Sequence, residues 1–92
     1  MVFMKNLEKI ELVAKGIANK RRIAILFLLV REPKLDLELI AGRLNFGYKS
    51  TAEHLRKMHL AGLIEKEYEG SYVLHATTNR GKKIAAFLLK LS

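Results

Sequence analysis

The sequence contains no cysteine, and its only proline is Pro33. Without cysteine the chain forms no disulfide, no thiolate nucleophile and no cysteine-ligated metal site, which fits a reducing cytosol. The longest apolar run, Ile23 to Val30, is far too short to cross a membrane. Lys5 and Glu8 follow the start too closely for the apolar core of a signal peptide. We therefore expect a cytoplasmic protein with no membrane partner.

Acidic residues are scarce: 9 stand against 17 lysines and arginines, giving a formal net charge of +8 and a pI near 10.0. A small basic protein most often meets phosphate, whether in DNA, RNA or a lipid surface. The alternative is that the positive charge comes from surface lysines that only keep the protein soluble. Half of the 92 residues are apolar, which predicts one small domain over residues 1–92. A core of this size gives only marginal stability to a monomer, so oligomerisation would stabilise the fold.

Two helices are predicted in the first third of the chain. Apolar residues at spacings of four, three, four and three place one face of a helix over about residues 2–18; they are Phe3, Leu7, Ile10, Ala14 and Ile17. Asn19 is the expected N-cap of a second, buried helix that ends before Pro33. The first turn of that helix carries Lys20, Arg21 and Arg22. Positive charge at a positive helix end is unfavourable, which makes sense if an anion binds there.

The middle of the chain indicates two helices joined by a short turn. Lys34 and Leu35 are expected to be extended, and Asp36 to cap a helix that runs through Leu44. Asn45 tolerates the left-handed conformation that ends a helix. Phe46 and Gly47 then form a turn before a helix over about residues 48–61. Helices joined by about three or four residues are typical of a helix-turn-helix.

The last third predicts a hairpin and a final helix. Gly62 sits where a left-handed residue ends the preceding helix, and Leu63 is expected to fold back on Met58. Two strands follow, residues 63–68 and 72–77, joined by a turn at 69–71. Thr78 is the predicted N-cap of a helix over residues 79–91. The fold class is therefore mainly α with a small β-hairpin wing, a winged helix-turn-helix.

Four stretches resemble the ArsR-type winged helix-turn-helix regulators. HLRKMHLAGLIEK (54–66) resembles their H-L-x-x-L-x-x-A-G-L-[IV] motif, and IANKRRIAIL (17–26) their N-x-x-R-x-x-I-L motif. LELIAGRLNFGYKST (37–51) resembles their L-A-x-x-L-G-L-S-x-S-T turn. TTNRGKKIAAFL (77–88) resembles an L-T-x-x-G-[RK] opening that MarR-type regulators share. The chain lacks the cysteine motif of the family's metal sensors, so we expect no thiolate metal site.

The helix over 48–61 is the predicted recognition helix. At 100° per residue, Thr51, Leu55, Met58 and Gly62 face the core. We expect its early residues to reach bases and its later residues to reach phosphates. The base candidates are Tyr48, Lys49, Ser50 and Glu53, with Lys49 suited to guanine and Glu53 to cytosine; the phosphate candidates are Arg56 and Lys57. The alternative is a solvated face with Lys49–Glu53 and Glu53–Lys57 ion pairs.

Further phosphate contacts are expected outside that helix. Lys20, Arg21 and Arg22 form one candidate group, with a solvated charged turn as the alternative. The wing tip at residues 67–71 is acidic, so it grips DNA poorly or contacts a protein, although Lys66 and Tyr72 still suit phosphate or sugar. Arg80, Lys82 and Lys83 form either a phosphate patch or a solvated face.

The three histidines do not predict a metal site. His54 and His59 lie about 140° apart on a helix, a poor chelating geometry, and His75 stands alone on a strand. No nucleophile-base pair, glycine-rich phosphate loop or paired acidic site is present. We expect no metal, no cofactor and no enzymatic activity.

The terminal helices carry more apolar surface than a domain of this size covers. We expect them to form the interface of a homodimer, through Phe3, Leu7, Ile10, Phe87, Leu88 and Leu91. The alternative is that these stripes only close the monomer core. A dimer would set two recognition helices about 34 Å apart. The sequence therefore predicts a homodimeric transcriptional regulator that binds specific double-stranded DNA; the alternative is a winged-helix module for protein interaction or RNA binding within a larger complex.

Overall fold

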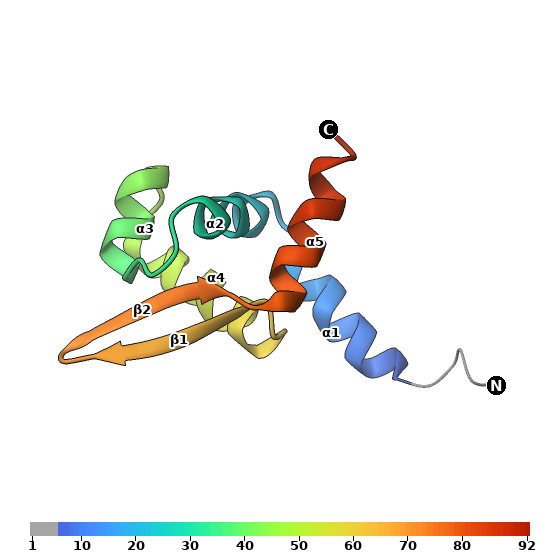
Figure 1. Ribbon diagram of the computed structural model, residues 1–92, viewed down its shortest axis with the longest axis horizontal. Helices are drawn as coiled ribbons and strands as arrows, with labels where there is room; N and C mark the ends of the chain where they lie inside the picture. The colour runs from blue at the N-terminus through green and yellow to red at the C-terminus, as the bar shows by residue number, and fades with distance from the viewer. Residues whose placement is uncertain (1–5) are drawn as a thin grey trace.

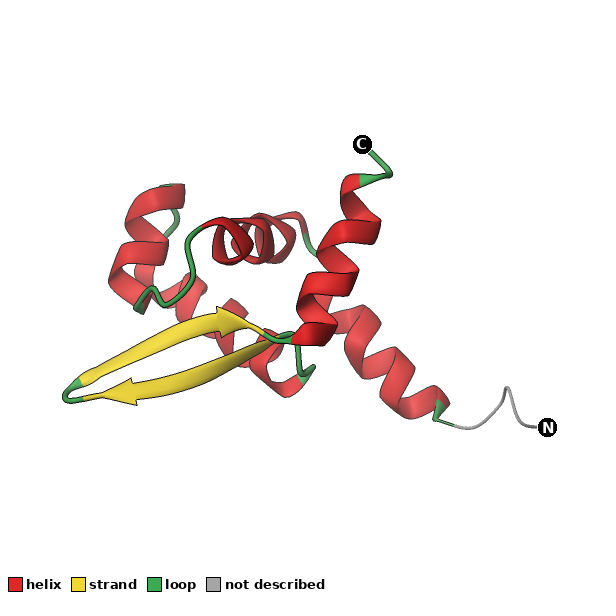
Figure 2. Cartoon of the chain, viewed as in Figure 1, coloured by secondary structure: helices red, strands yellow, loops and turns green. Residues whose placement is uncertain are grey.

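The computed structural model describes residues 6–92, and in this part of the chain helices dominate (Figure 1). The helices are α1 (Leu7–Ile17), α2 (Lys20–Arg31), α3 (Leu37–Leu44), α4 (Tyr48–Leu60) and α5 (Asn79–Leu89), with the strands β1 (Ile64–Glu69) and β2 (Tyr72–Thr77) between α4 and α5. Figure 2 shows the two strands as one hairpin that projects from the helical body. The predicted winged helix-turn-helix is confirmed.

Helix α2 lies at the centre and is contacted by the other four described helices and by β2. Its Ile25, Leu26 and Leu29 are fully buried, at positions that share one side of a helix. The same core takes in residues of α3, α4, α5 and the hairpin, namely Ile40, Leu55, Met58, Leu63, Ile64 and Ala85. One apolar core therefore fixes the orientation of α4, the predicted recognition helix.

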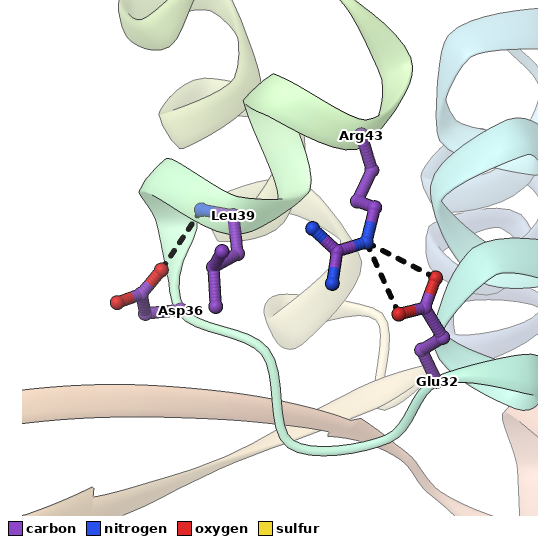
Figure 3. Close-up of polar contacts among 4 residues, drawn as sticks. All are labelled: Glu32, Asp36, Leu39 and Arg43. Atoms are coloured by element: carbon purple, nitrogen blue, oxygen red, sulfur yellow. Dashed lines mark hydrogen bonds and ion pairs between the residues drawn. The ribbon is translucent and has the colours of Figure 1, made fainter.

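Three N-caps occur where the sequence predicted them. The Asn19 side chain accepts hydrogen bonds from the backbone N–H groups of Arg21 (2.9 Å) and Arg22 (3.2 Å). Asp36 accepts one from the Leu39 N–H at 2.8 Å (Figure 3), and Thr78 accepts one from the Gly81 N–H at 3.1 Å. Each such cap stabilises its helix by about 1 kcal/mol.

An ion pair joins the last turn of α3 to the end of α2. The Nε of Arg43 lies 3.1 and 3.3 Å from the two carboxylate oxygens of Glu32 (Figure 3). Both side chains are more than 40% exposed, so the pair adds little stability. It links the C-terminal ends of α2 and α3 at the surface.

The end of α4 has the predicted geometry. Gly62 is left-handed, with φ of 72°, and the N–H groups of Gly62 and Leu63 donate to the carbonyls of His59 and Met58 at 3.0 Å. Leu63 and Met58 are fully buried, as the fold-back predicts. The Gly62 carbonyl accepts a hydrogen bond from the hydroxyl of Thr78, the N-cap of α5, at 2.6 Å.

Arg80 is a structural residue here. Its Nη1 donates to the carbonyl of Ala61 at 2.9 Å, beside the Thr78 contact. Of the predicted patch Arg80–Lys82–Lys83, only the two lysines are exposed. The start of α5 is thus tied to the end of α4 by two side chains.

The hairpin pairs Ile64 with Thr77 and Glu69 with Tyr72, around a two-residue turn at Gly70 and Ser71. Leu35 bridges to His75 on the far side of β2, so its predicted extended conformation is confirmed. Lys34 is different: its φ is 64°, so the prediction of an extended residue was wrong there. The left-handed turn at Lys34 brings the chain back from α2 toward β2.

Several element boundaries differ from the sequence prediction; among them, the first strand ends at Glu69 instead of Tyr68, which shortens the predicted turn at 69–71 to two residues. The first helix begins at Leu7 because Asn6 is left-handed, with φ of 65°, and the predicted part over residues 2–5 lies outside the described residues. The first strand starts at Ile64 because Leu63 is used to close α4. The last helix ends at Leu89 instead of Leu91. After Leu89 the backbone N–H groups donate to the carbonyl three residues earlier and not to the one four residues earlier.

Candidate nucleic-acid interface

Helix α4 has one buried and one exposed side, divided as the helical wheel predicts. Thr51, Leu55 and Met58 are buried against the core. Tyr48 is 63% exposed, and Lys49, Ser50, Glu53, Arg56 and Lys57 are exposed as well. Gly47 is extended and opens the helix without a side-chain cap, while the Ser50 hydroxyl donates to its carbonyl at 3.2 Å. The N-terminal turn of α4 is therefore open to a partner.

An ion pair occupies the middle of the exposed side of α4. Arg56 donates from Nε and Nη2 to the two oxygens of Glu53, at 2.6 and 2.9 Å. This hydrogen bond is the main reason why the pKa of Glu53 is lowered and the pKa of Arg56 is raised. The alternative Lys49–Glu53 and Glu53–Lys57 pairs do not form. Within residues 6–92, no carboxylate oxygen lies within 4.0 Å of the Lys49 or Lys57 ammonium, so neither lysine forms an ion pair that a ligand would have to break.

The first turn of α2 adds two exposed cations beside α4. Lys20 and Arg21 are exposed, and the Arg21 guanidinium lies 4.9 Å from the centre of the Phe46 ring. That cation–π contact fixes Arg21 next to the turn between α3 and α4. Both residues stand where the sequence expected a phosphate-binding group.

Arg22 is placed differently from its two neighbours. Its side chain is only 9% exposed, so the alternative of a solvated turn is wrong for this residue. Its Nε and Nη1 are buried and have no hydrogen-bond partner among residues 6–92. The sequence carried a signal for this burial: Arg22 stands three, four and seven residues before the buried Ile25, Leu26 and Leu29, and so lies on their side of α2.

His54 sits among the same cations. Burial is the main cause that lowers its pKa, and the charges of Arg22, Arg21 and Lys57 lower it further. The imidazole is therefore neutral at pH 7, and its Nδ1 is buried without a partner in the described chain. The side of α4 that faces α2 thus has a concentrated positive potential.

The wing presents acidic and aromatic side chains. Glu67 pairs with Lys34 at 3.5 Å across an exposed surface, and Tyr68 and Tyr72 are largely exposed. Lys66 is half-buried and lines a hollow of about 410 Å³ between the wing, α3 and α4, together with Tyr48 and Tyr72. Lys66 therefore faces the start of α4, whereas the wing tip does not supply the cations of a minor-groove probe.

A second exposed surface lies between α1 and α5. Ile10 is 56% and Phe87 61% exposed, and both line an apolar groove of about 550 Å³ with Val13, Ile17, Ile84 and the half-buried Leu88. Leu7 and Leu91 are exposed beside it, and Phe3 lies outside the described residues. Val13, Ile17 and Ile84 do pack on the core. The remaining apolar side chains do not close the monomer core, which favours the other expectation, a dimer interface.

Over residues 6–92, no three histidine, aspartate or glutamate side chains gather closely enough to hold a metal ion. No helix in that range has the length and apolar character needed to cross a bilayer.

Comparison with known proteins identifies the fold. No protein-family model and no curated protein matches the chain. The homodimeric winged helix-turn-helix DNA-binding domain of Mb0332 from Mycobacterium bovis, a possible ArsR-family transcriptional regulator, superposes with a TM-score of 0.85 at 23% identity, over 96% of this chain and 84% of that one. HlyU from Vibrio cholerae gives 0.82 at 26% identity, over 96% of each chain. An Escherichia coli protein described as a predicted DNA-binding transcriptional regulator gives 0.83 at 21%, over 99% and 97%.

The structural neighbours are thus winged helix-turn-helix transcriptional regulators of the ArsR and MarR kind, as the four sequence motifs predicted. They are regulators and not enzymes, in line with the expectation from the sequence.

Proposed function

We propose that this chain is a cytoplasmic, homodimeric transcriptional regulator that binds specific double-stranded DNA through α4. The observation that carries the proposal is the exposed outer side of α4, bordered by the cations of α2. A helix about 10–12 Å wide fits a major groove about 12 Å wide. The winged-helix neighbours support the same role.

Each exposed residue has a distinct role in this proposal. Lys49 donates to guanine O6 or N7, and Glu53 accepts from cytosine N4. Tyr48 and Ser50 contact neighbouring base edges from the first turn. The phosphate contacts come from Lys20, Arg21, Arg56, Lys57 and Lys66, while the buried Arg22 adds positive potential from beneath.

A second copy of the chain covers the groove between α1 and α5. A twofold axis there would bury Ile10 and Phe87 of both copies, with Leu7, Leu88 and Leu91 around them. The terminal helices of the domain over residues 1–92 would then form the dimer interface, and Phe3 is expected to join it. The two α4 helices would stand about 34 Å apart and read a pseudo-palindromic site.

Selection of bound duplexes from a random pool tests the DNA proposal. A palindromic consensus should emerge, and its affinity should fall steeply with salt. Lys49→Ala should relax the preference at one base pair, worth about 1–3 kcal/mol of discrimination. Arg21→Ala should weaken all duplexes alike. Lys90→Ala, at the end of α5 and outside the predicted DNA-contacting groups, is the matched control. A consensus that is insensitive to Tyr48, Lys49, Ser50 and Arg56 would refute the recognition-helix assignment.

Sedimentation equilibrium tests the dimer. Phe87→Glu should produce monomers, because a charge would enter the buried centre of the apolar interface. Tyr68→Glu, an equally drastic change on the exposed wing, should leave the mass unchanged. A wild-type chain that sediments as a monomer at micromolar concentration would exclude the proposed interface.

The acidic wing supports the second candidate, a winged-helix module that binds a protein or RNA. Glu67 and Glu69 surround Tyr68 at the exposed tip, a composition suited to a basic protein surface. Absence of duplex enrichment, together with a partner recovered from native extract that Tyr68→Ala no longer binds, would favour this candidate.

A further inference from the structure

Arg22 is the least expected feature of the structure. A guanidinium keeps its charge in proteins and has five N–H donors to satisfy. Here Nε and Nη1 are buried without a hydrogen-bond partner in residues 6–92, and the whole residue is 9% exposed. A buried, unpaired charge is unfavourable, and an anion with good hydrogen-bond geometry offsets that cost.

Arg22 lines a pocket of about 400 Å³ at the junction of α1, α2 and α4. Lys15 of α1 and Lys57 of α4 lie in the same lining, and no lining residue is acidic. Lys57 has no carboxylate partner in the described chain, while Lys15 has an exposed one, Glu11, at 3.6 Å. Three cations therefore converge on one pocket.

The remaining walls of the pocket are apolar. Leu12 and Leu60 line it, and both are about half exposed. Gly16 lets α1 approach the end of α4 closely, because a Cβ there would collide with the Ala61 side chain. The lining thus combines three cations with apolar side chains, and its volume is within the range of small-molecule sites.

We propose that this pocket binds a small organic anion, a carboxylate on a compact apolar body. The anion would pair with Arg22 and Lys57 and place its apolar body between Leu12 and Leu60. A phosphate of duplex DNA fits the pocket less well, because the stiff backbone stays at the surface, whereas a free carboxylate can enter the pocket. The pocket shares Arg22 and Lys57 with the proposed DNA-binding surface, but benzoate binding is measured without DNA, so each proposal can fail without the other.

Benzoate is a suitable probe, with neutral benzamide and inorganic phosphate as matched probes. In the folded chain at constant ionic strength, the Arg22 Nε–Hε signal should shift saturably with benzoate, with a dissociation constant on the order of 1 mM. Benzamide should leave that signal in place. Lys57→Met should weaken benzoate at least about fivefold, whereas Lys83→Met should have no effect.

Two results would overturn the proposal. If benzamide binds as tightly as benzoate, the pocket takes apolar molecules and the cations are incidental. If only phosphate or a duplex moves the Arg22 signal, the pocket is a subsite for the DNA backbone. Arg22→Met is a second variant; thermal denaturation shows whether it folds, and a folded form that still binds benzoate would also contradict the role of Arg22.

Discussion

Arg56 holds Glu53 with two hydrogen bonds, Nε to Oε1 at 2.6 Å and Nη2 to Oε2 at 2.9 Å, on the outer side of α4. The pair is open to solvent, so it breaks readily when a stronger partner arrives. In the proposed complex Arg56 turns to a phosphate and Glu53 to a base. Without DNA, each side chain masks the charge of the other.

Glu53→Gln removes the carboxylate that holds Arg56. We expect affinity for random duplexes to rise about threefold to tenfold, because one repulsive charge is lost and Arg56 is released. Preference for cytosine at one position should fall at the same time. Fluorescence anisotropy with specific and random duplexes measures both effects. Glu69→Gln makes the same charge change on the wing and should change neither the affinity for random duplexes nor the cytosine preference. Equal effects of the two variants would mean that only the net charge matters.

Gly16 and Gly42 form a matched pair of helical glycines. A Cβ at Gly16 collides with Ala61, whereas a Cβ at Gly42 meets nothing within 4 Å. Gly42→Ala should stabilise the protein by about 0.5–1 kcal/mol through helix propensity. Gly16→Ala should destabilise it by about 1–2 kcal/mol, since overpacking exceeds the same gain. Urea denaturation measures both, and equal shifts would mean that α1 moves freely relative to α4.

Thr78 caps α5 and also donates to Gly62, two residues after the end of α4. Its hydroxyl accepts from the Gly81 N–H at 3.1 Å and donates to Gly62 O at 2.6 Å. Thr78→Ala should therefore cost about 1–2 kcal/mol, since one cap and one further hydrogen bond are lost. Thr78→Ser keeps the hydroxyl and should retain most of the stability. A serine variant as unstable as the alanine variant would assign the effect to the methyl group.

Stability should fall as the pH drops below about 6.5, the usual pKa of histidine. Burial is the main cause that lowers the pKa of both His75 and His54, so the unfolded chain takes up protons before the folded chain does. The His75 Nδ1 lies 3.0 Å from Leu35 O, a contact that Asn can reproduce. His75→Asn should reduce the loss of unfolding free energy between about pH 7.5 and about pH 5.5, as measured by urea denaturation at each pH. His59→Asn, on the exposed side of α4, should have a smaller effect, because the charge of His59 is only a minor cause of the lowered pKa of His75. An equal loss of stability in both variants would contradict the role of His75.

The sequence predicted those features that depend on residues close together in the chain. The caps at Asn19, Asp36 and Thr78 each use a side chain and a backbone group two or three residues away, so their pattern is visible in the sequence. The left-handed Gly62 and the fold-back of Leu63 follow from the same local chemistry. The exposed side of α4 followed from periodicity alone.

The features that depend on packing between helices were missed. The spacing of Arg22 from Ile25, Leu26 and Leu29 signalled its burial, but not that its guanidinium would lack a hydrogen-bond partner. The collision partner of a Cβ at Gly16 is 45 residues further along the chain, at Ala61. The choice of Arg56 over Lys57 as the partner of Glu53 depends on side-chain rotamers that charge spacing does not fix. Arg80 was taken for a surface cation, although the carbonyl it binds belongs to α4.

The two contacts between the end of α4 and the start of α5, Thr78 to Gly62 and Arg80 to Ala61, leave no free linker between them. In the proposed dimer, α5 stands at the twofold axis, so the distance between the two α4 helices would be fixed. One added base pair between half-sites moves the second target outward and rotates it by about 34–36° around the duplex. Such a regulator tolerates sequence drift within a half-site better than any change in the distance between half-sites.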